Sequence, residues 1–163
     1  HIENLTPEAK KFKEKIIHTD AKVYVIDDEE LERVYKNYPV MWKNASAEPS
    51  LCFIGCPHLT FYQLNQWTEK IEENLKLSGK RKVCIRTVMT SAPDVVEKFK
   101  ETENYLKLKK FGVNISSICP LMYTNNPIAG SKPIITNSNK LRTYSKARYY
   151  KDDDIVKIIC GVK

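Results

Sequence analysis

The sequence lacks the long apolar segments that would place the chain in a membrane or direct it out of the cell. No apolar run approaches the ~20 residues that a membrane-spanning helix needs. Residues 1–15 are mostly polar, without the apolar stretch of a signal peptide. Internal repeats and low-complexity segments are also absent. We therefore predict a soluble, cytoplasmic protein without a membrane partner, in which residues 1–163 form one α/β domain.

Closely spaced cysteine pairs are lacking as well. The sequence contains no Cys-x-x-Cys motif, which argues against a zinc ribbon or a thioredoxin-like site. The sequence contains five cysteines. This odd number argues against a disulfide framework and indicates that the thiols are reduced. They are Cys52, Cys56, Cys84, Cys119 and Cys160.

Recognised nucleic-acid-binding motifs are missing, although the formal net charge is +7. The lysines are spread along the chain and interleaved with glutamates, as in residues 69–73. Such mixing of signs is typical of solvated helix faces. We therefore predict no nucleic-acid partner.

In the first third of the chain, the pattern predicts two helices and one strand. Thr6 and Pro7 favour a helix start, and this helix is expected to end near residue 17. Residues 22–26 have the composition of a strand. Asp27 then offers an N-cap for a helix that reaches about residue 38.

From residue 50 onward, predicted strands and helices alternate. Short apolar runs predict strands, and segments with apolar residues at helical spacing predict helices. The predicted strands are residues 51–54, 82–87, 113–118, 133–136 and 154–160, and the predicted helices are residues 61–78, 91–111 and 139–150. This alternation favours an α/β fold with a mostly parallel sheet and helices on both faces.

Unusual residues follow three of the predicted strands, at the edge where open parallel sheets bind ligands. They are Cys56 with His58, Cys119, and the segment 136–140. Because Cys56 is expected just before a helix, the helix N-terminus would favour its thiolate, either as a nucleophile or as a metal ligand. Cys119 precedes a proline on a strand-end loop, a setting in which iron–sulfur ligands also occur.

Structural roles remain open for the same residues. A cysteine in such a protein is often a small buried apolar residue, and we expect this role for Cys52, Cys84 and Cys160. For Cys56 and Cys119 both interpretations stand. His58 could equally cap a helix or lie in the core, and Ser138 with Lys140 could simply begin a helix.

Taken together, these segments resemble the aconitase X family, in the C-terminal catalytic region of its large subunit. The matching stretches are LCFIGCPH at residues 51–58, Ile118-Cys119-Pro120, and TNSNK at residues 136–140 followed by Tyr144. The resemblance begins near residue 19. It implies an aconitase-domain-like fold and a chain that forms a portion of a longer catalytic subunit.

The resemblance also implies an activity, a cofactor and partners. Members of the family are iron–sulfur hydro-lyases (dehydratases) of hydroxy acids, either mevalonate 5-phosphate or cis-3-hydroxy-L-proline. By this resemblance, two cluster ligands are Cys56 and Cys119, with a third outside this chain, and His58 is a donor beside the cluster. The segment facing the substrate comprises Thr136, Asn137, Ser138 and Lys140. The implied partners are the remainder of the large subunit, a small swivelling subunit or domain, and an anionic substrate.

Two other functions remain as alternatives at this point. The chain could be a binding or regulatory domain of the same fold that holds no cluster, because its ligand set is incomplete. It could also be a thiol enzyme with Cys56 as the nucleophile and His58 as the base. The sequence identifies no general base for the dehydratase reaction.

Overall fold

The computed structural model describes residues 1–124 and 126–162. By its internal contacts the chain divides into two units, His1–Tyr38 and Pro39–Lys163. Among the described residues, no helix combines the length and the apolar character that crossing a membrane requires. Each unit is described below by itself.

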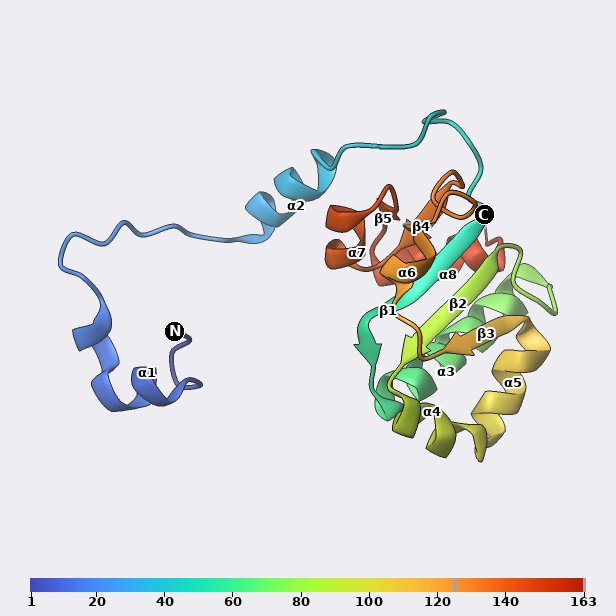
Figure 1. The fold of residues 1–163 in the computed structure, drawn as a ribbon, viewed down its shortest axis with the longest axis horizontal. Helices are drawn as coiled ribbons and strands as arrows, with labels where there is room; N and C mark the ends of the chain where they lie inside the picture. Colours follow the sequence, from blue (N-terminus) through green and yellow to red (C-terminus); the bar gives the residue numbers. More distant parts are fainter. Residues whose placement is uncertain (125, 163) are drawn as a thin grey trace. The chain divides into compact units, whose positions relative to one another are not determined.

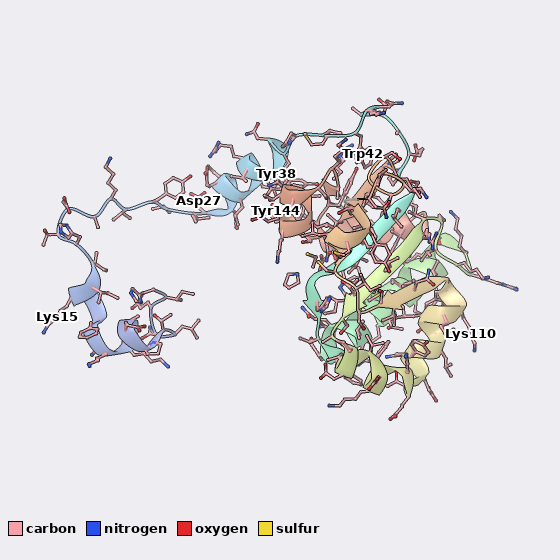
Figure 2. The ribbon with its side chains drawn as sticks, in the orientation of Figure 1. Lys15, Asp27, Tyr38, Trp42, Lys110 and Tyr144 are labelled. Atoms are coloured by element: carbon pink, nitrogen blue, oxygen red, sulfur yellow. The ribbon has the colours of Figure 1, made fainter. Side chains whose placement is uncertain are left out.

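The N-terminal unit contains short helices and an extended segment. Helix α1 (Pro7–Phe12) begins at the predicted residue, with Thr6 as N-cap, and continues as the 3-10 helix η1 (Lys13–Ile16). Helix α2 (Asp28–Lys36) has Asp27 as its N-cap, as predicted (Figure 2), and the Asp27 carboxylate accepts a hydrogen bond from the Glu30 backbone N–H at 2.8 Å.

The strand predicted at residues 22–26 is wrong. This segment forms no strand, and its side chains Val23, Tyr24, Val25 and Ile26 are exposed. A strand is stabilised by backbone bonds to a neighbouring strand and by burial of one face. Local composition provides neither, so the apolar pattern alone is not enough here.

The C-terminal unit contains a parallel five-stranded sheet with the order β3-β2-β1-β4-β5. Every pair of neighbouring strands is parallel, which confirms the predicted fold class. The strands are β1 (Leu51–Leu59), β2 (Arg86–Ser91), β3 (Val113–Ser116), β4 (Ile134–Thr136) and β5 (Arg148–Tyr149). The helices are α3 (Phe61–Ser78), α4 (Pro93–Lys100), α5 (Glu103–Phe111), α6 (Pro120–Thr124), α7 (Asn139–Tyr144) and α8 (Asp152–Cys160).

Helices cover both faces of the sheet, as predicted (Figure 1). Because successive strand residues point to opposite faces, β1 contributes Cys52 and Ile54 to one core and Leu51 and Phe53 to the other. The larger core includes buried residues from α3, α4, α5 and α8. The smaller core lies under α6 and α7 and includes Leu141.

The last predicted strand, residues 154–160, is a helix instead. Residues 152–154 are acidic and stabilise the N-terminus of α8, and Gly161 ends the helix in the left-handed conformation. Its buried Ile155, Val156 and Ile159 have helical spacing and pack beside α3. A short apolar run does not distinguish a strand from a buried helix. The outer strand of the sheet beside β4 is instead β5. Its residues belong to the segment 139–150, which was predicted to be a helix.

Two further boundaries differ from the prediction. Strand β2 begins at Arg86 rather than at residue 82, so Cys84 lies outside the sheet and is exposed, contrary to prediction. The helix predicted at residues 91–111 is two helices, because the Thr102 side chain accepts a bond from the Tyr105 N–H and begins α5. The predicted helix end at residue 111 is confirmed, because α5 ends at Phe111 and Gly112 has a left-handed backbone.

Candidate functional site

The segment Gly-Cys-Pro-His at residues 55–58 forms a wide bulge at the carboxyl end of β1. Ile54 pairs with Met89 of β2, and Leu59 pairs with Ser91, so residues 55–58 lie opposite a single residue of β2. Inserted residues of this kind leave the regular ladder and re-aim side chains at the edges of sheets. Figure 1 shows β1 bending away from its straight course in this region.

Hydrogen bonds from β2 hold both ends of this bulge. The buried Thr90 hydroxyl donates to the Gly55 carbonyl, and the buried Ser91 hydroxyl donates to the Leu59 carbonyl at 2.5 Å. These bonds satisfy carbonyl groups that the irregular pairing would otherwise leave without partners. Sequence analysis did not identify Thr90 and Ser91. The available signal was the pair of hydroxyl residues that ends β2, the strand that pairs with β1.

Cys56 lies in this bulge and is half-buried, whereas Pro57 and His58 are exposed. Its side chain packs against the smaller core together with residues of α6. Helix α3 begins at Phe61, as predicted, and is capped by the Thr60 side chain. Cys56, however, lies within β1, and residues 57–60 separate it from the helix. The helix N-terminus therefore does not explain a stabilised thiolate at Cys56, and the thiol-enzyme alternative loses that support.

Cys119 follows β3 and is exposed, directly before α6. Its carbonyl accepts the Met122 N–H at 2.9 Å. Helix α6 is tied to the smaller core by Tyr123, whose ring centroid lies 5.7 Å from that of Phe53 on β1. The helix that follows Cys119 and the side chain of Cys56 thus contact the same cluster.

Both cysteines lie at the carboxyl edge of the sheet, because β1 and β3 are parallel members of one sheet. Strand β2 lies between them, so the axes of β1 and β3 are about 10 Å apart. Thiols on loops beyond these strands can approach more closely than the axes do. Within residues 1–124 and 126–162, however, no three His, Cys, Asp or Glu side chains gather as a metal site would require.

The segment 136–140 leaves the same edge of the sheet from β4. Thr136 and Ser138 are buried, and the Ser138 hydroxyl caps α7 by accepting the Leu141 N–H at 2.9 Å. The Asn137 side chain donates to Asp152 at 2.8 Å. Lys140 is exposed in the first turn of α7. Ser138 therefore has a structural role, and Lys140 is the member of the segment that is most accessible to an anion.

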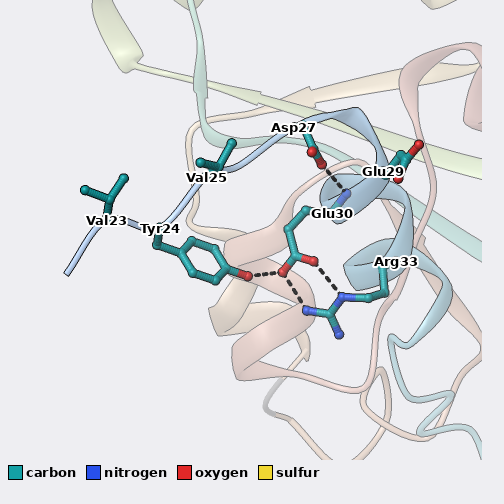
Figure 3. A pocket seen from close by; sticks show the side chains of 7 residues that line it. All are labelled: Val23, Tyr24, Val25, Asp27, Glu29, Glu30 and Arg33. Carbon is teal, nitrogen blue, oxygen red and sulfur yellow. Dashed lines mark hydrogen bonds and ion pairs between the residues drawn. The ribbon is translucent and has the colours of Figure 1, made fainter.

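A different surface concavity belongs to the N-terminal unit, and none of the predicted site residues lines it. Figure 3 shows its centre, where the Tyr24 hydroxyl donates to Glu30 and the Arg33 Nε donates to the same carboxylate at 2.6 Å. Hydrogen bonds from Arg33 and then from Tyr24 lower the pKa of Glu30 to about 2. Because this carboxylate and guanidinium already bond each other, we interpret the cluster as a structural ion pair.

Two comparisons with known proteins found matches for this fold. Residues 49–157 match the family model described as the aconitase X third domain. The chain is also similar to the crystal structure of Thermococcus kodakaraensis aconitase X in its holo-form, with a TM-score of 0.64 and 20% sequence identity. That match covers 89% of this chain and 36% of the Thermococcus chain. No curated protein matches the sequence.

The matched range contains the bulge with Cys56, the loop with Cys119 and the segment 136–140. It also contains all five strands of the sheet. The family model covers more than half of the chain. The chain therefore belongs to the aconitase X family.

Proposed function

We propose that this chain is part of the catalytic subunit of an iron–sulfur hydro-lyase that dehydrates a hydroxy acid. The observation that carries the proposal is the carboxyl edge of the parallel sheet in a chain of the aconitase X family. There, Cys56 lies in the bulge of β1, Cys119 follows β3 and Lys140 follows β4. The substrate is an anion, and the two candidates are mevalonate 5-phosphate and cis-3-hydroxy-L-proline.

The two thiols are suited to cluster ligation because neither is buried in the apolar interior. Thiolates are the usual ligands of iron–sulfur clusters. The bonds from Thr90 and Ser91 hold the Cys56 bulge in place, which limits the reorganisation that ligation would require. With only two ligands here, the third would come from a part of the catalytic subunit outside this chain.

When bound, a cluster with an incompletely ligated iron supplies a Lewis acid for the leaving hydroxyl group. The residues of this chain would then bind and orient the substrate. Lys140, exposed at the start of α7, would pair with its carboxylate or phosphate. Two hydrogen bonds would support this segment. The Asn137 side chain donates to Asp152, and the Thr136 hydroxyl accepts from the Ser138 N–H. His58, exposed beside Cys56, would donate to the cluster ligands.

The proposed partners are the remainder of the large subunit and a small swivelling subunit or domain. The match covers 36% of the Thermococcus chain, and the family model that residues 49–157 match is described as a third domain, so other segments would complete the proposed active site. We expect the chain by itself not to retain a cluster. Reduced thiols of this kind suit the cytoplasm, which is the proposed location.

The test replaces each proposed ligand in the complete assembly. We expect Cys56→Ser and Cys119→Ser to lose most of the bound iron and the visible absorbance of the cluster after anaerobic reconstitution. Cys84→Ser is the matched control, because Cys84 is exposed but lies before β2, at the opposite edge of the sheet. Unchanged iron content in the Cys56 and Cys119 variants would contradict the proposal. Assays of the unmodified assembly with each candidate acid would identify the substrate.

A further inference from the structure

A second cavity lies at the opposite edge of the sheet from the candidate site. Its volume is about 160 Å³. The segments that line it lead into the amino ends of β1, β4 and β5. The Ser50 N–H donates to the Pro133 carbonyl at 3.0 Å and joins two of these segments. The lining residues that matter here are Trp42, Lys43, Ala47, Lys132, Pro133 and Lys146.

The charge of this cavity has one sign. Lys43, Lys132 and Lys146 line it, and the lining contains no aspartate or glutamate. In the part of the chain that the structure describes, none of the ion pairs involves these three lysines. Positive charge without a carboxylate partner raises the local concentration of anions.

Trp42 supplies a second, independent observation. Only 9% of this residue is exposed, and its indole Nε1–H is buried without a hydrogen-bond partner among residues 1–124 and 126–162. A buried donor without an acceptor is destabilising and is rare in folded proteins. An acceptor supplied by a bound molecule would satisfy it.

Arg148 adds a further positive charge beside Trp42. Its guanidinium carbon lies 5.9 Å from the centroid of the Trp42 ring and 5.3 Å from that of Tyr150. This stacking holds the guanidinium near the aromatic wall of the cavity. Ala47 and Pro133 provide apolar wall beside the charged groups.

We propose that this cavity binds the phosphate group of a small molecule. A phosphate carries close to two negative charges at neutral pH and presents several acceptor oxygens. Lysines bind phosphate as point charges, whereas planar carboxylates are matched best by paired arginine donors. One phosphate oxygen would accept the Trp42 indole N–H after a small shift of the segment that carries Trp42, because the nitrogen is covered in this structure. The site is separate from the proposed dehydratase site and does not depend on a cluster.

The test uses nuclear magnetic resonance of the full chain labelled with ¹⁵N at tryptophan. The sequence contains two tryptophans, so Trp67 on α3 is an internal control. With inorganic phosphate at constant ionic strength, we expect a saturable shift of the Trp42 indole signal and no shift for Trp67. Acetate at the same concentration should leave both signals in place. No saturable shift, or an equal response to acetate, overturns the phosphate assignment.

Variants then test which groups bind the phosphate. We expect Trp42→Phe, which keeps an aromatic ring, to weaken phosphate binding about tenfold by calorimetry, the effect of losing one hydrogen bond to a charged group. The double variant Lys132→Gln, Lys146→Gln should weaken phosphate binding further than Trp42→Phe does. Lys98→Gln is the matched control, because Lys98 is exposed on α4 and lies outside the cavity. If the lysine pair and Lys98 variants bind phosphate equally well, the cavity is not the site.

Discussion

Gly55 adopts a backbone conformation that other residues rarely take. Its φ is +105°, and a Cβ at this position would lie 2.4 Å from the Thr90 carbonyl oxygen. We expect Gly55→Ala to lower the free energy of unfolding by about 2–4 kcal/mol, through backbone strain and steric overlap. Urea unfolding would measure the change.

Gly79 offers the matched control for this experiment. It also has a positive φ, +67°, but a Cβ there would meet nothing within 4 Å. Gly79→Ala should therefore cost only about 1–2 kcal/mol, the strain of the left-handed backbone alone. Equal losses at the two positions would show that the contact with Thr90 does not constrain the bulge.

Burial divides the five cysteines into reactive and protected groups. Burial raises the pKa of the Cys52 thiol, and it raises the pKa of the Cys160 thiol to about 12. Because the thiolate is the reactive form, both should stay unlabelled by iodoacetamide near pH 8 while the chain is folded. We expect exposed Cys84 and Cys119 to be labelled first, as peptide mass mapping would show. Labelling of Cys52 as fast as Cys119 in the native chain would contradict this burial.

At the scale of elements, an ion-paired carboxylate joins α3 to α5. Glu72 on α3 bonds Lys107 on α5 at 2.8 Å and Lys76 on its own helix at 3.1 Å. Hydrogen bonds from Lys107 and then from Lys76 lower the pKa of Glu72 below its ordinary value of 4.5. The stabilisation by this carboxylate is therefore complete above pH 4.5 and is lost as the pH falls through the lowered pKa.

We expect this loss to appear as a difference in acid sensitivity. Between about pH 5 and pH 3, the free energy of unfolding should fall more steeply for the unmodified chain than for Glu72→Gln, which lacks the titrating group. Glu73→Gln is the control, because Glu73 is exposed on the same helix. Parallel curves for the unmodified chain and Glu72→Gln would mean that the pair does not stabilise the fold.

At the scale of the whole molecule, the two units differ in how much core each one has. Ala9 is buried in the N-terminal unit, whereas both hydrophobic cores lie in residues 39–163. The family match begins only at residue 49. We therefore expect a protein of residues 39–163 to unfold cooperatively, with a free energy of unfolding within about 1 kcal/mol of the full chain. A loss of several kcal/mol on removing residues 1–38 would show that these residues stabilise the sheet.

Several elements could be predicted because their signals are local. Helix α3 combines a capping threonine, apolar residues at helical spacing and a terminal glycine, and each acts within one or two turns. The continuous apolar run at residues 51–54 indicated a strand buried on both faces, and Leu51 and Ile54, which belong to different cores, are both buried. The short strand predicted at residues 133–136 is β4. The motifs around Cys56, Cys119 and residues 136–140 indicated the family, which the match to residues 49–157 confirms.

Other features depended on neighbours that local sequence does not specify. Residues 22–26 and 154–160 share an apolar composition, but the first forms no strand and the second is a helix packed beside α3. Cys84 and Cys160 both looked like strand residues, and only Cys160 is buried. Short apolar segments take the structure that their contacts stabilise, so composition alone does not decide between these outcomes.

By itself, therefore, the sequence determined the parallel fold class and the family, and its motifs indicated the residues of the candidate site. Only the tertiary structure decided how that site is presented. The bulge at residues 55–58 exists because Thr90 and Ser91, more than thirty positions away in the sequence, bond the Gly55 and Leu59 carbonyls. The cavity around Trp42 likewise exists because loops before β1, β4 and β5 meet at one edge. Contacts between distant segments depend on the three-dimensional path of the chain, and local patterns carry no information about that path.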